Sequence, residues 1–177
     1  MRIFIALLFD EPVKNKIWDM LNEVEEIAEK GNYSRYENLH LTLLYLGETS
    51  QEMLGKIIAK LKEIKFKKFS YQTGHLDFFK KAKTKKIVYL SVNRSMTLES
   101  LQHLVCVKLK ELNIDFHSEK YTPHITFGRE VSLISDDDLQ MVKTVPLEIL
   151  ADRISIMEST RIDGQLTYIE LDNVPLN

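Results

Sequence analysis

The sequence predicts an α+β protein with two similar, pseudo-symmetric lobes, each an antiparallel sheet backed by helices, and an active-site groove between them. Apolar runs typical of strands alternate with segments whose apolar residues recur every three or four positions, as in amphipathic helices. The order strand, helix, strand, helix, strand occurs over residues 2–79 and again over residues 87–158. Both repeats contain a strand with the pattern His-x-Thr. An internal duplication would bring these two strands side by side or across one groove.

The length and composition of the chain are those of an ordinary globular protein. We expect residues 1–177 to form one domain, whose two small lobes share a core. The net charge of −2 argues against a molecule that binds polyanions over its whole surface. Cys106 is the only cysteine, which predicts no internal disulfide and a reducing, cytoplasmic setting. Residues 3–9, the longest apolar run near the N-terminus, are too few for a membrane span, so no membrane partner is expected.

The first repeat begins with a strand over residues 2–9, interpreted as buried on both faces because it is almost entirely apolar. Asp10 or Glu11 can cap the helix that follows, and Pro12 suits its first turn. Apolar residues at helical spacing then continue until Gly31, where the helix is expected to end.

A polar link over residues 32–38 leads to the first His-x-Thr strand, which is predicted over residues 39–47. Ser50 can cap the second helix. Residues 66–79 are then predicted to form a long strand, or a strand with a bulge near Gly74. These elements complete the first repeat.

The second repeat follows a lysine-rich turn at residues 80–86. Its lysines are interpreted as a strand edge and a hairpin tip, where lysine deters aggregation, with a nucleic-acid footprint as the alternative. The remaining predicted elements are a strand over residues 87–92, a helix over 97–112, the second His-x-Thr strand at 123–128, a short helix over 136–142, and strands over 147–158 and 166–171.

The two motifs carry the chemistry that the sequence suggests. His40 is followed two residues later by Thr42, and His124 by Thr126. Because side chains alternate between the faces of a strand, each His shares a face with its Thr. A single buried His is more often a hydrogen-bonded core residue than a catalyst, but two with matched Thr partners favour one site with two proton-transfer groups.

These residues resemble the signatures of a known family. The segments Asn38-Leu39-His40-Leu41-Thr42-Leu43 and Pro123-His124-Ile125-Thr126-Phe127-Gly128-Arg129 are similar to the two motifs of the two-histidine phosphoesterase superfamily. Within it, the chain looks like the RNA 2′,3′-cyclic phosphodiesterases of the LigT/ThpR type, once described as 2′-5′ RNA ligases. Phe127-Gly128 stands where Leu-Ala is more usual, and Tyr121 where Phe is common. Neither difference removes a chemical group.

The resemblance implies hydrolysis of 2′,3′-cyclic phosphate ends of RNA or nucleotides, with the 3′-oxygen leaving to give a 2′-phosphate. Two histidines, one neutral and one protonated, can perform this reaction without a metal or other cofactor. We assign His124 to activating water as general base and His40 to protonating the leaving oxygen as general acid, an assignment that can be reversed. Thr42 and Thr126 can donate hydroxyls to the phosphoryl oxygens. If a bend after Gly128 turns Arg129 inward, its charged guanidinium can donate two hydrogen bonds to the phosphate; otherwise Arg129 is a surface residue.

Several alternatives stay open at this point. Two histidines can ligate zinc, although neither motif has a further ligand at suitable spacing. The fold can also serve as a non-catalytic RNA-binding module, as a 2′-5′ RNA ligase or as a 2′-5′ oligonucleotide phosphodiesterase. Tyr36 and Tyr45 can stack on a base or simply pack against the protein. We expect a monomer that binds cyclic-phosphate ends of RNA or nucleotides.

Overall fold

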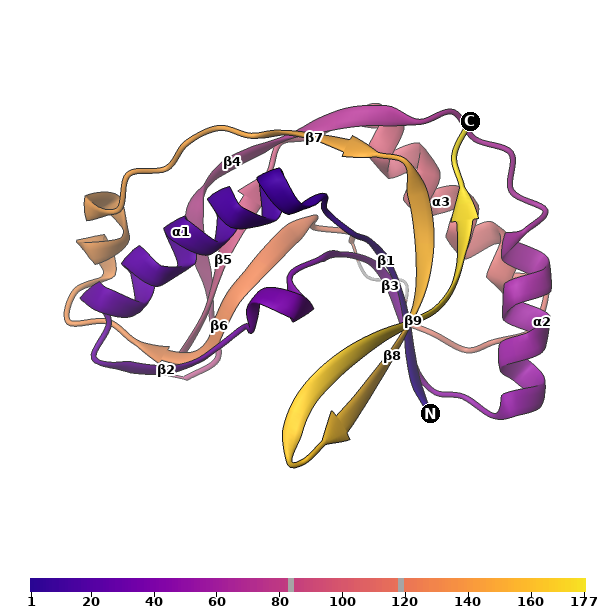
Figure 1. Cartoon of the computed structure of the whole chain (residues 1–177), viewed down its shortest axis with the longest axis horizontal. Helices are drawn as coiled ribbons and strands as arrows, with labels where there is room; N and C mark the ends of the chain where they lie inside the picture. Colours follow the sequence, from indigo (N-terminus) through magenta and orange to yellow (C-terminus); the bar gives the residue numbers. More distant parts are fainter. Residues whose placement is uncertain (83–84, 118–119) are drawn as a thin grey trace.

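The structure, a computed structural model, describes residues 1–82, 85–117 and 120–177 and contains two antiparallel sheets (Figure 1). The four-stranded sheet has the order β3-β1-β8-β9, with bounds Leu41–Glu48, Arg2–Leu7, Arg153–Ile162 and Gln165–Pro175. The five-stranded sheet has the order β2-β6-β5-β4-β7, with bounds Lys30–Tyr33, His124–Ser132, Lys86–Val92, Phe69–Lys80 and Glu148–Ala151. The predicted α+β class with two antiparallel sheets is confirmed.

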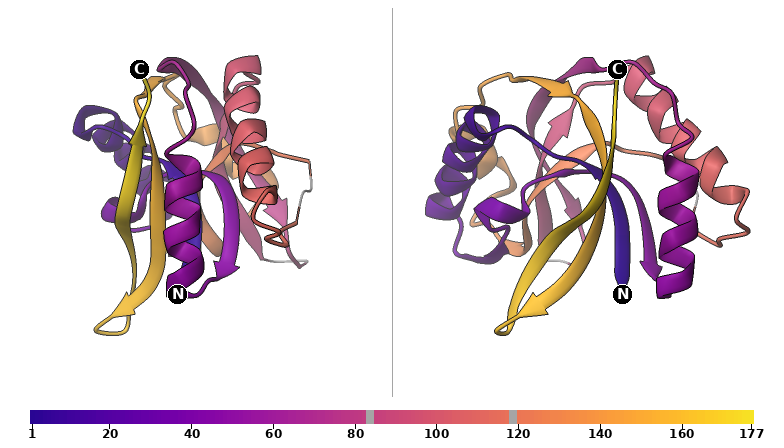
Figure 2. Two further views of the ribbon diagram at one scale, coloured as in Figure 1. Left: turned by 90° about the vertical axis from the view of Figure 1, so that its right-hand side faces the viewer. Right: turned by 45° about the vertical axis from the view of Figure 1, so that its right-hand side comes forward.

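Helices cover the sheets from opposite ends of the molecule. Helix α1 (Glu11–Ile27) packs beside β2 of the five-stranded sheet, whereas α2 (Gln51–Leu61) and α3 (Met96–Lys110) pack together against the other sheet (Figures 1 and 2). Asp10 caps α1 as expected, because its Oδ1 accepts a hydrogen bond from the Val13 amide at 3.0 Å. Two short 3₁₀ helices, η1 (Tyr36–Asn38) and η2 (Asp136–Met141), complete the described elements. No described helix has the length and apolarity needed to cross a membrane.

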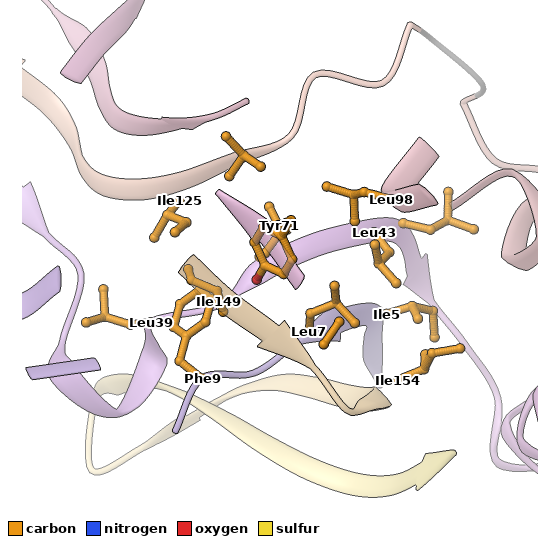
Figure 3. Packing of buried hydrophobic residues seen from close by; sticks show 14 of the residues in the cluster. Ile5, Leu7, Phe9, Leu39, Leu43, Tyr71, Leu98, Ile125, Ile149 and Ile154 are labelled. Atoms are coloured by element: carbon orange, nitrogen blue, oxygen red, sulfur yellow. The ribbon is translucent and has the colours of Figure 1, made fainter. Parts of the chain in front are cut away.

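One continuous core joins the two sheets. Ile5 and Leu43 of the four-stranded sheet belong to the same buried cluster as Tyr71, Ile125 and Ile149 of the five-stranded sheet (Figure 3). The two sheets are therefore held as one unit by apolar burial, which contributes about 25 cal/mol per Å² of apolar surface removed from water. Sites that lie between the sheets are built on a rigid support.

Several predicted element boundaries were wrong. The polar link over residues 32–38 contains half of β2 and the whole of η1. The single strand predicted over residues 147–158 is two strands, since β7 pairs with β4 while β8 pairs with β1 and β9. The chain crosses from one sheet to the other at Asp152, with neither glycine nor proline at the crossing. The helix expected over residues 136–142 is the 3₁₀ helix η2.

The two sheets do not correspond to consecutive halves of the chain. Strand β8, from the second half, completes the sheet of β1 and β3, and β4, from the first half, completes the sheet of β5 and β6. Each sheet thus contains the first strand and the His-x-Thr strand of one half beside the third strand of the other. A duplication with exchange of the third strand would give this order, and the duplication itself stays a prediction.

The lysine-rich turn is largely paired within the protein. The buried Lys86 ammonium lies 2.8 Å from Asp136 and 5.0 Å from the centre of the Phe78 ring. Lys85 contacts Glu130 at 2.9 Å, and Lys80 lies 3.9 Å from Asp136. This pairing favours a structural role for these lysines. Lys83 lies outside the described residues.

Candidate active site

All five site residues predicted from the sequence line one groove of about 910 Å³. The groove lies between the two sheets, because its walls come from β1, β3, β8 and β9 on one side and from β2 and β6 on the other. The predicted residues that it brings together are His40, Thr42, His124, Thr126 and Arg129.

A β-bulge shapes the wall that carries the first motif. Along the β1–β3 ladder, Leu43 has no partner, since its neighbours pair with consecutive residues of β1. The extra residue shifts the alternation of side chains by one position. As a result Thr42 and Tyr45, which are three residues apart, both line the groove, and Tyr45 is 57% exposed there.

A second bulge turns Arg129 toward the groove. The β5–β6 register shifts twice here: Thr126 and Gly128 pair with consecutive residues of β5, which leaves Phe127 without a partner, and pairing resumes only at Val131. Glu130, in the second irregularity, has φ of 54°. The structure therefore contains the bend after Gly128 on which the predicted role of Arg129 depends. Gly128 is required for close packing, because a Cβ atom there would come within 2.9 Å of Tyr33.

The two histidines are held in the same way. His40 Nδ1 lies 2.7 Å from the carbonyl oxygen of Asn38, and His124 Nδ1 lies 2.7 Å from the carbonyl oxygen of Thr122. A carbonyl oxygen only accepts hydrogen bonds, so Nδ1 of each ring carries a hydrogen and donates it. In both neutral rings Nε2 is consequently the nitrogen that can accept a proton. This arrangement fixes the tautomer that an acid–base pair requires.

The two Thr hydroxyls are placed differently. Thr42 Oγ1 lies 2.9 Å from His40 Nε2, so the hydroxyl donates to the neutral ring. Among the described residues, His124 Nε2 has no hydrogen-bond partner. Thr126 lines the groove beside it. His124 Nε2 is therefore the more accessible of the two Nε2 atoms.

Each histidine packs against two aromatic rings that the sequence analysis did not identify. The centre of the His40 ring lies 5.0 Å from that of Phe4 and 5.2 Å from that of Tyr168. The His124 ring lies 5.2 Å from both Phe79 and Tyr89. Of these four rings, only Phe4 had a signal in the sequence. It alternates with core residues along a strand that was interpreted as buried on both faces, so its ring was expected to be buried. These rings restrict the orientation of each imidazole.

Burial and positive charge lower the pKa of both histidines. Burial lowers the pKa of His40 to about 4, and the nearby charges of His124 and Arg129 act in the same direction. Burial also lowers the pKa of His124, again with a contribution from Arg129. The groove thus holds neutral imidazoles, and its arginines give it an excess of positive charge, which favours binding of an anion.

Hydrogen bonds from neighbouring segments hold the two motif strands in place. The Tyr121 hydroxyl donates to the Thr42 carbonyl at 2.9 Å, which gives this hydroxyl the role that the sequence left open. The Ser34 hydroxyl donates to the Thr126 carbonyl at 2.8 Å.

Tyr36 does not line the groove, since its hydroxyl donates to Asn15 and its ring packs on Trp18. Within the described ranges, no three His, Cys, Asp or Glu side chains gather as a metal site would require.

Asn38 connects His40 to the β8–β9 hairpin. Its buried amide donates to the Leu166 carbonyl at 2.9 Å and accepts from the Tyr168 amide at 3.1 Å. Its own carbonyl holds His40, and Tyr168 packs on the His40 ring. Asn38 is therefore a positioning residue that fixes both the imidazole and the aromatic ring beside it.

We expect Asn38→Ala to lower the free energy of unfolding by about 1–3 kcal/mol, because two backbone groups of β9 lose their partner. The kcat for the reaction catalysed in the groove should fall as well, since Tyr168 is no longer tied beside His40. Denaturant unfolding and turnover assays measure the two effects. Asn15→Ala is the matched control, because its partner Tyr36 lies outside the groove. Unchanged stability and kcat in Asn38→Ala would contradict this role.

Comparison with known proteins agrees with this geometry. Residues 13–163 match the model of the 2′-5′ RNA ligase superfamily. The chain is 28% identical to an RNA 2′,3′-cyclic phosphodiesterase of Thermotoga maritima, over 90% of this chain and 87% of that protein. It is 32% identical to an RNA 2′,3′-cyclic phosphodiesterase of Archaeoglobus fulgidus, over 73% of this chain and 72% of that protein.

Solved structures show the same fold. TT0787 of Thermus thermophilus superposes with a TM-score of 0.82 at 20% identity, covering 99% of this chain and 98% of that one. LigT of E. coli superposes with a TM-score of 0.78 at 20% identity, covering 99% and 96% of the two chains. The resemblance drawn from the two His-x-Thr motifs is confirmed, and the chain belongs to the 2′-5′ RNA ligase superfamily of two-histidine phosphoesterases.

Proposed function

We propose that this protein is an RNA 2′,3′-cyclic phosphodiesterase, which hydrolyses cyclic-phosphate ends of RNA or nucleotides to 2′-phosphates. The observation that carries the proposal is the pair of histidines with identically fixed tautomers in one positively charged groove. Relatives that share up to 32% identity with the chain are named for this activity. The groove supplies both proton-transfer groups and donors for the phosphoryl oxygens.

In the proposed reaction, water attacks the phosphorus while Nε2 of one neutral histidine takes its proton. The bond from phosphorus to the 3′-oxygen breaks, and that oxygen takes a proton from Nε2–H of the second histidine. The product is a 2′-phosphate with a free 3′-hydroxyl, and the two histidines have exchanged protonation states. Each such proton transfer typically contributes ~10²–10⁴ in rate.

Thr42, Thr126 and Arg129 are proposed to hold the phosphate. Thr42 would turn its hydroxyl from His40 Nε2 to a phosphoryl oxygen when the substrate enters, and Thr126 donates from the opposite wall. Arg129 lies close enough to both imidazoles to lower their pKa, so its charge acts where the phosphate binds. Donors aimed at developing negative charge stabilise the transition state more than the ground state.

The assignment of His40 as acid and His124 as base stays a proposal. The lower pKa of His40, about 4 in the free protein, favours its neutral form and hence the reverse assignment. A bound phosphate anion acts oppositely and raises the pKa of both rings. The leaving-group experiment described in the Discussion decides between the two assignments.

A monomer acting in the cytoplasm is part of the same proposal. Every residue assigned to the site comes from one chain, so no second subunit is needed to complete the groove. The half-buried Cys106 carries a free thiol, which suits a reducing compartment.

The proposal is tested by incubating the protein with adenosine 2′,3′-cyclic phosphate and with a cyclic-ended RNA in the presence of EDTA. We expect adenosine 2′-phosphate and RNA with a 2′-phosphate, identified by chromatography against both isomers. A 3′-phosphate product would overturn the proposed leaving group. Binding without turnover would instead support an RNA-binding module, and joining to a 5′-hydroxyl RNA would support a ligase.

A further inference from the structure

Two arginines have no carboxylate partner among the described residues, and both line the groove. The chain has six arginines. Four of them contact a carboxylate: Arg2 with Glu48, Arg35 with Glu37, Arg94 with Glu99, and Arg153 with Asp152 and Glu170. Within the part of the chain that the structure describes, Arg129 and Arg161 make no such contact, and both face the same groove. Unpaired guanidinium groups in a groove are suited to bind phosphate.

Arg161 lies farther along the groove than the reacting centre. On the β8–β9 hairpin, Ser159 is opposite Tyr168, whose ring packs on His40. Arg161 is opposite Leu166, one side-chain repeat farther toward the tip, or about 7 Å along the strand. All four residues line the groove. The hairpin extends well beyond the rest of the four-stranded sheet, so this wall continues past the histidines (Figures 1 and 2).

The guanidinium of Arg161 is oriented but not neutralised. Its Nη1 donates to the Gly164 carbonyl at 2.8 Å, which uses one of its five N–H groups and holds the group beside the turn. A second pocket of about 430 Å³ adjoins Arg161, and that pocket contains Glu48 and Glu158. Glu48 is paired there with Arg2 and the N-terminal ammonium, whereas Glu158 pairs with no cation among the described residues. The free carboxylate of Glu158 disfavours a phosphate on its side, so an anion that binds Arg161 is expected on the side of the groove.

We propose that Arg161 binds the phosphodiester that joins the terminal, cyclic-phosphate-bearing nucleotide to its 5′ neighbour. This inference rests on the proposed function, in which Arg129 and the two motif threonines hold the cyclic phosphate. The two unpaired arginines then match the last two phosphates of an RNA end. The site selects RNA ends of two or more nucleotides over cyclic mononucleotides, and Leu166 offers an apolar surface to the sugar or base between the two phosphates.

The experiment compares kcat/KM for three substrates: adenosine 2′,3′-cyclic phosphate, the dinucleotide ApA with a 2′,3′-cyclic end, and the same dinucleotide with an uncharged methylphosphonate linkage. The charged dinucleotide should be preferred over its uncharged analogue by about 3- to 10-fold, a modest value because Arg161 is exposed. Arg161→Gln should abolish this preference. In Arg161→Gln, the slope of log kcat/KM against log salt concentration for the charged dinucleotide should become less negative by roughly 0.7.

Arg153→Gln is the matched control, since Arg153 lies on the same strand but does not line the groove and is paired with Asp152 and Glu170. This variant should keep the preference for the charged linkage. Equal kcat/KM for the charged and uncharged dinucleotides in the unaltered protein would overturn the inference, as would an unchanged preference in Arg161→Gln. Absence of turnover on all three substrates would instead refute the proposed function, so the two failures are distinguishable.

Discussion

Replacing either histidine of the groove with alanine should lower kcat for cyclic-phosphate hydrolysis by roughly 10²–10⁴, the usual contribution of a general acid or base. In His40→Ala and His124→Ala, Nε2 is lost and no other described titratable group in the groove has an equivalent position. Stability should change little, because both rings are only half-buried and border an open groove. Steady-state assays and thermal unfolding of the same preparations measure both effects. His103→Ala, on the exposed face of α3, is the control and should behave as the unaltered protein.

The same two variants decide which histidine is the acid. A p-nitrophenolate leaving group needs no proton, so bis(p-nitrophenyl) phosphate requires the base and not the acid. The acid variant should keep most of its activity on this ester, whereas the base variant should lose activity on both substrates. Under the assignment made from the sequence, His40→Ala is the variant that is rescued. Near-normal hydrolysis of cyclic phosphate by either variant would show that its histidine is neither acid nor base.

Removing either hydroxyl of the motif threonines should lower kcat by roughly 10²–10³, as for other single donors to a developing oxyanion. Thr42→Val and Thr126→Val keep the shape and β-branching of the side chain, so the strands should be preserved. The effect should fall mainly on kcat, because these donors act most strongly on the charge of the transition state. Steady-state kinetics on a cyclic-ended RNA separate kcat from KM.

Thr167→Val is the control for both threonine variants. Thr167 lies on β9, and its hydroxyl donates to the Gln165 carbonyl rather than into the groove. A loss confined to KM in Thr42→Val or Thr126→Val would show that the hydroxyl binds the ground state and the transition state equally. A kcat equal to that of Thr167→Val would remove the hydroxyl from the mechanism.

The sequence predicted which histidines and threonines meet in the groove because strand periodicity is local. Two-residue spacing alone places His40 with Thr42 and His124 with Thr126, and the groove contains all four side chains. The aromatic rings beside the histidines could not be found in this way. Phe79 reaches His124 through the pairing of β4 with β5, and Tyr168 reaches His40 through β9. Such contacts depend on long-range pairing, which a local pattern does not encode.

The sheet membership of β8 was missed for a similar reason. Apolar residues recur throughout residues 147–158, and the crossing between sheets at Asp152 has neither glycine nor proline to mark it. The bulge at Leu43 was also unforeseen, because an extra residue is visible only against its partner strand. By contrast, the bend after Gly128 was anticipated as the condition for an inward Arg129.

The pH dependence of kcat/KM in EDTA tests the two-histidine mechanism most directly. The base must be neutral and the acid charged, so activity rises through one pKa and falls through the other. Since kcat/KM reports the free protein and both histidine pKa values are lowered there, we predict a bell with its maximum below pH ~6.5. The maximum of kcat should lie at higher pH, because the bound phosphate raises both values. A single limb that rises and then levels off at high pH would contradict the mechanism, as would activity lost in EDTA and restored by zinc or manganese.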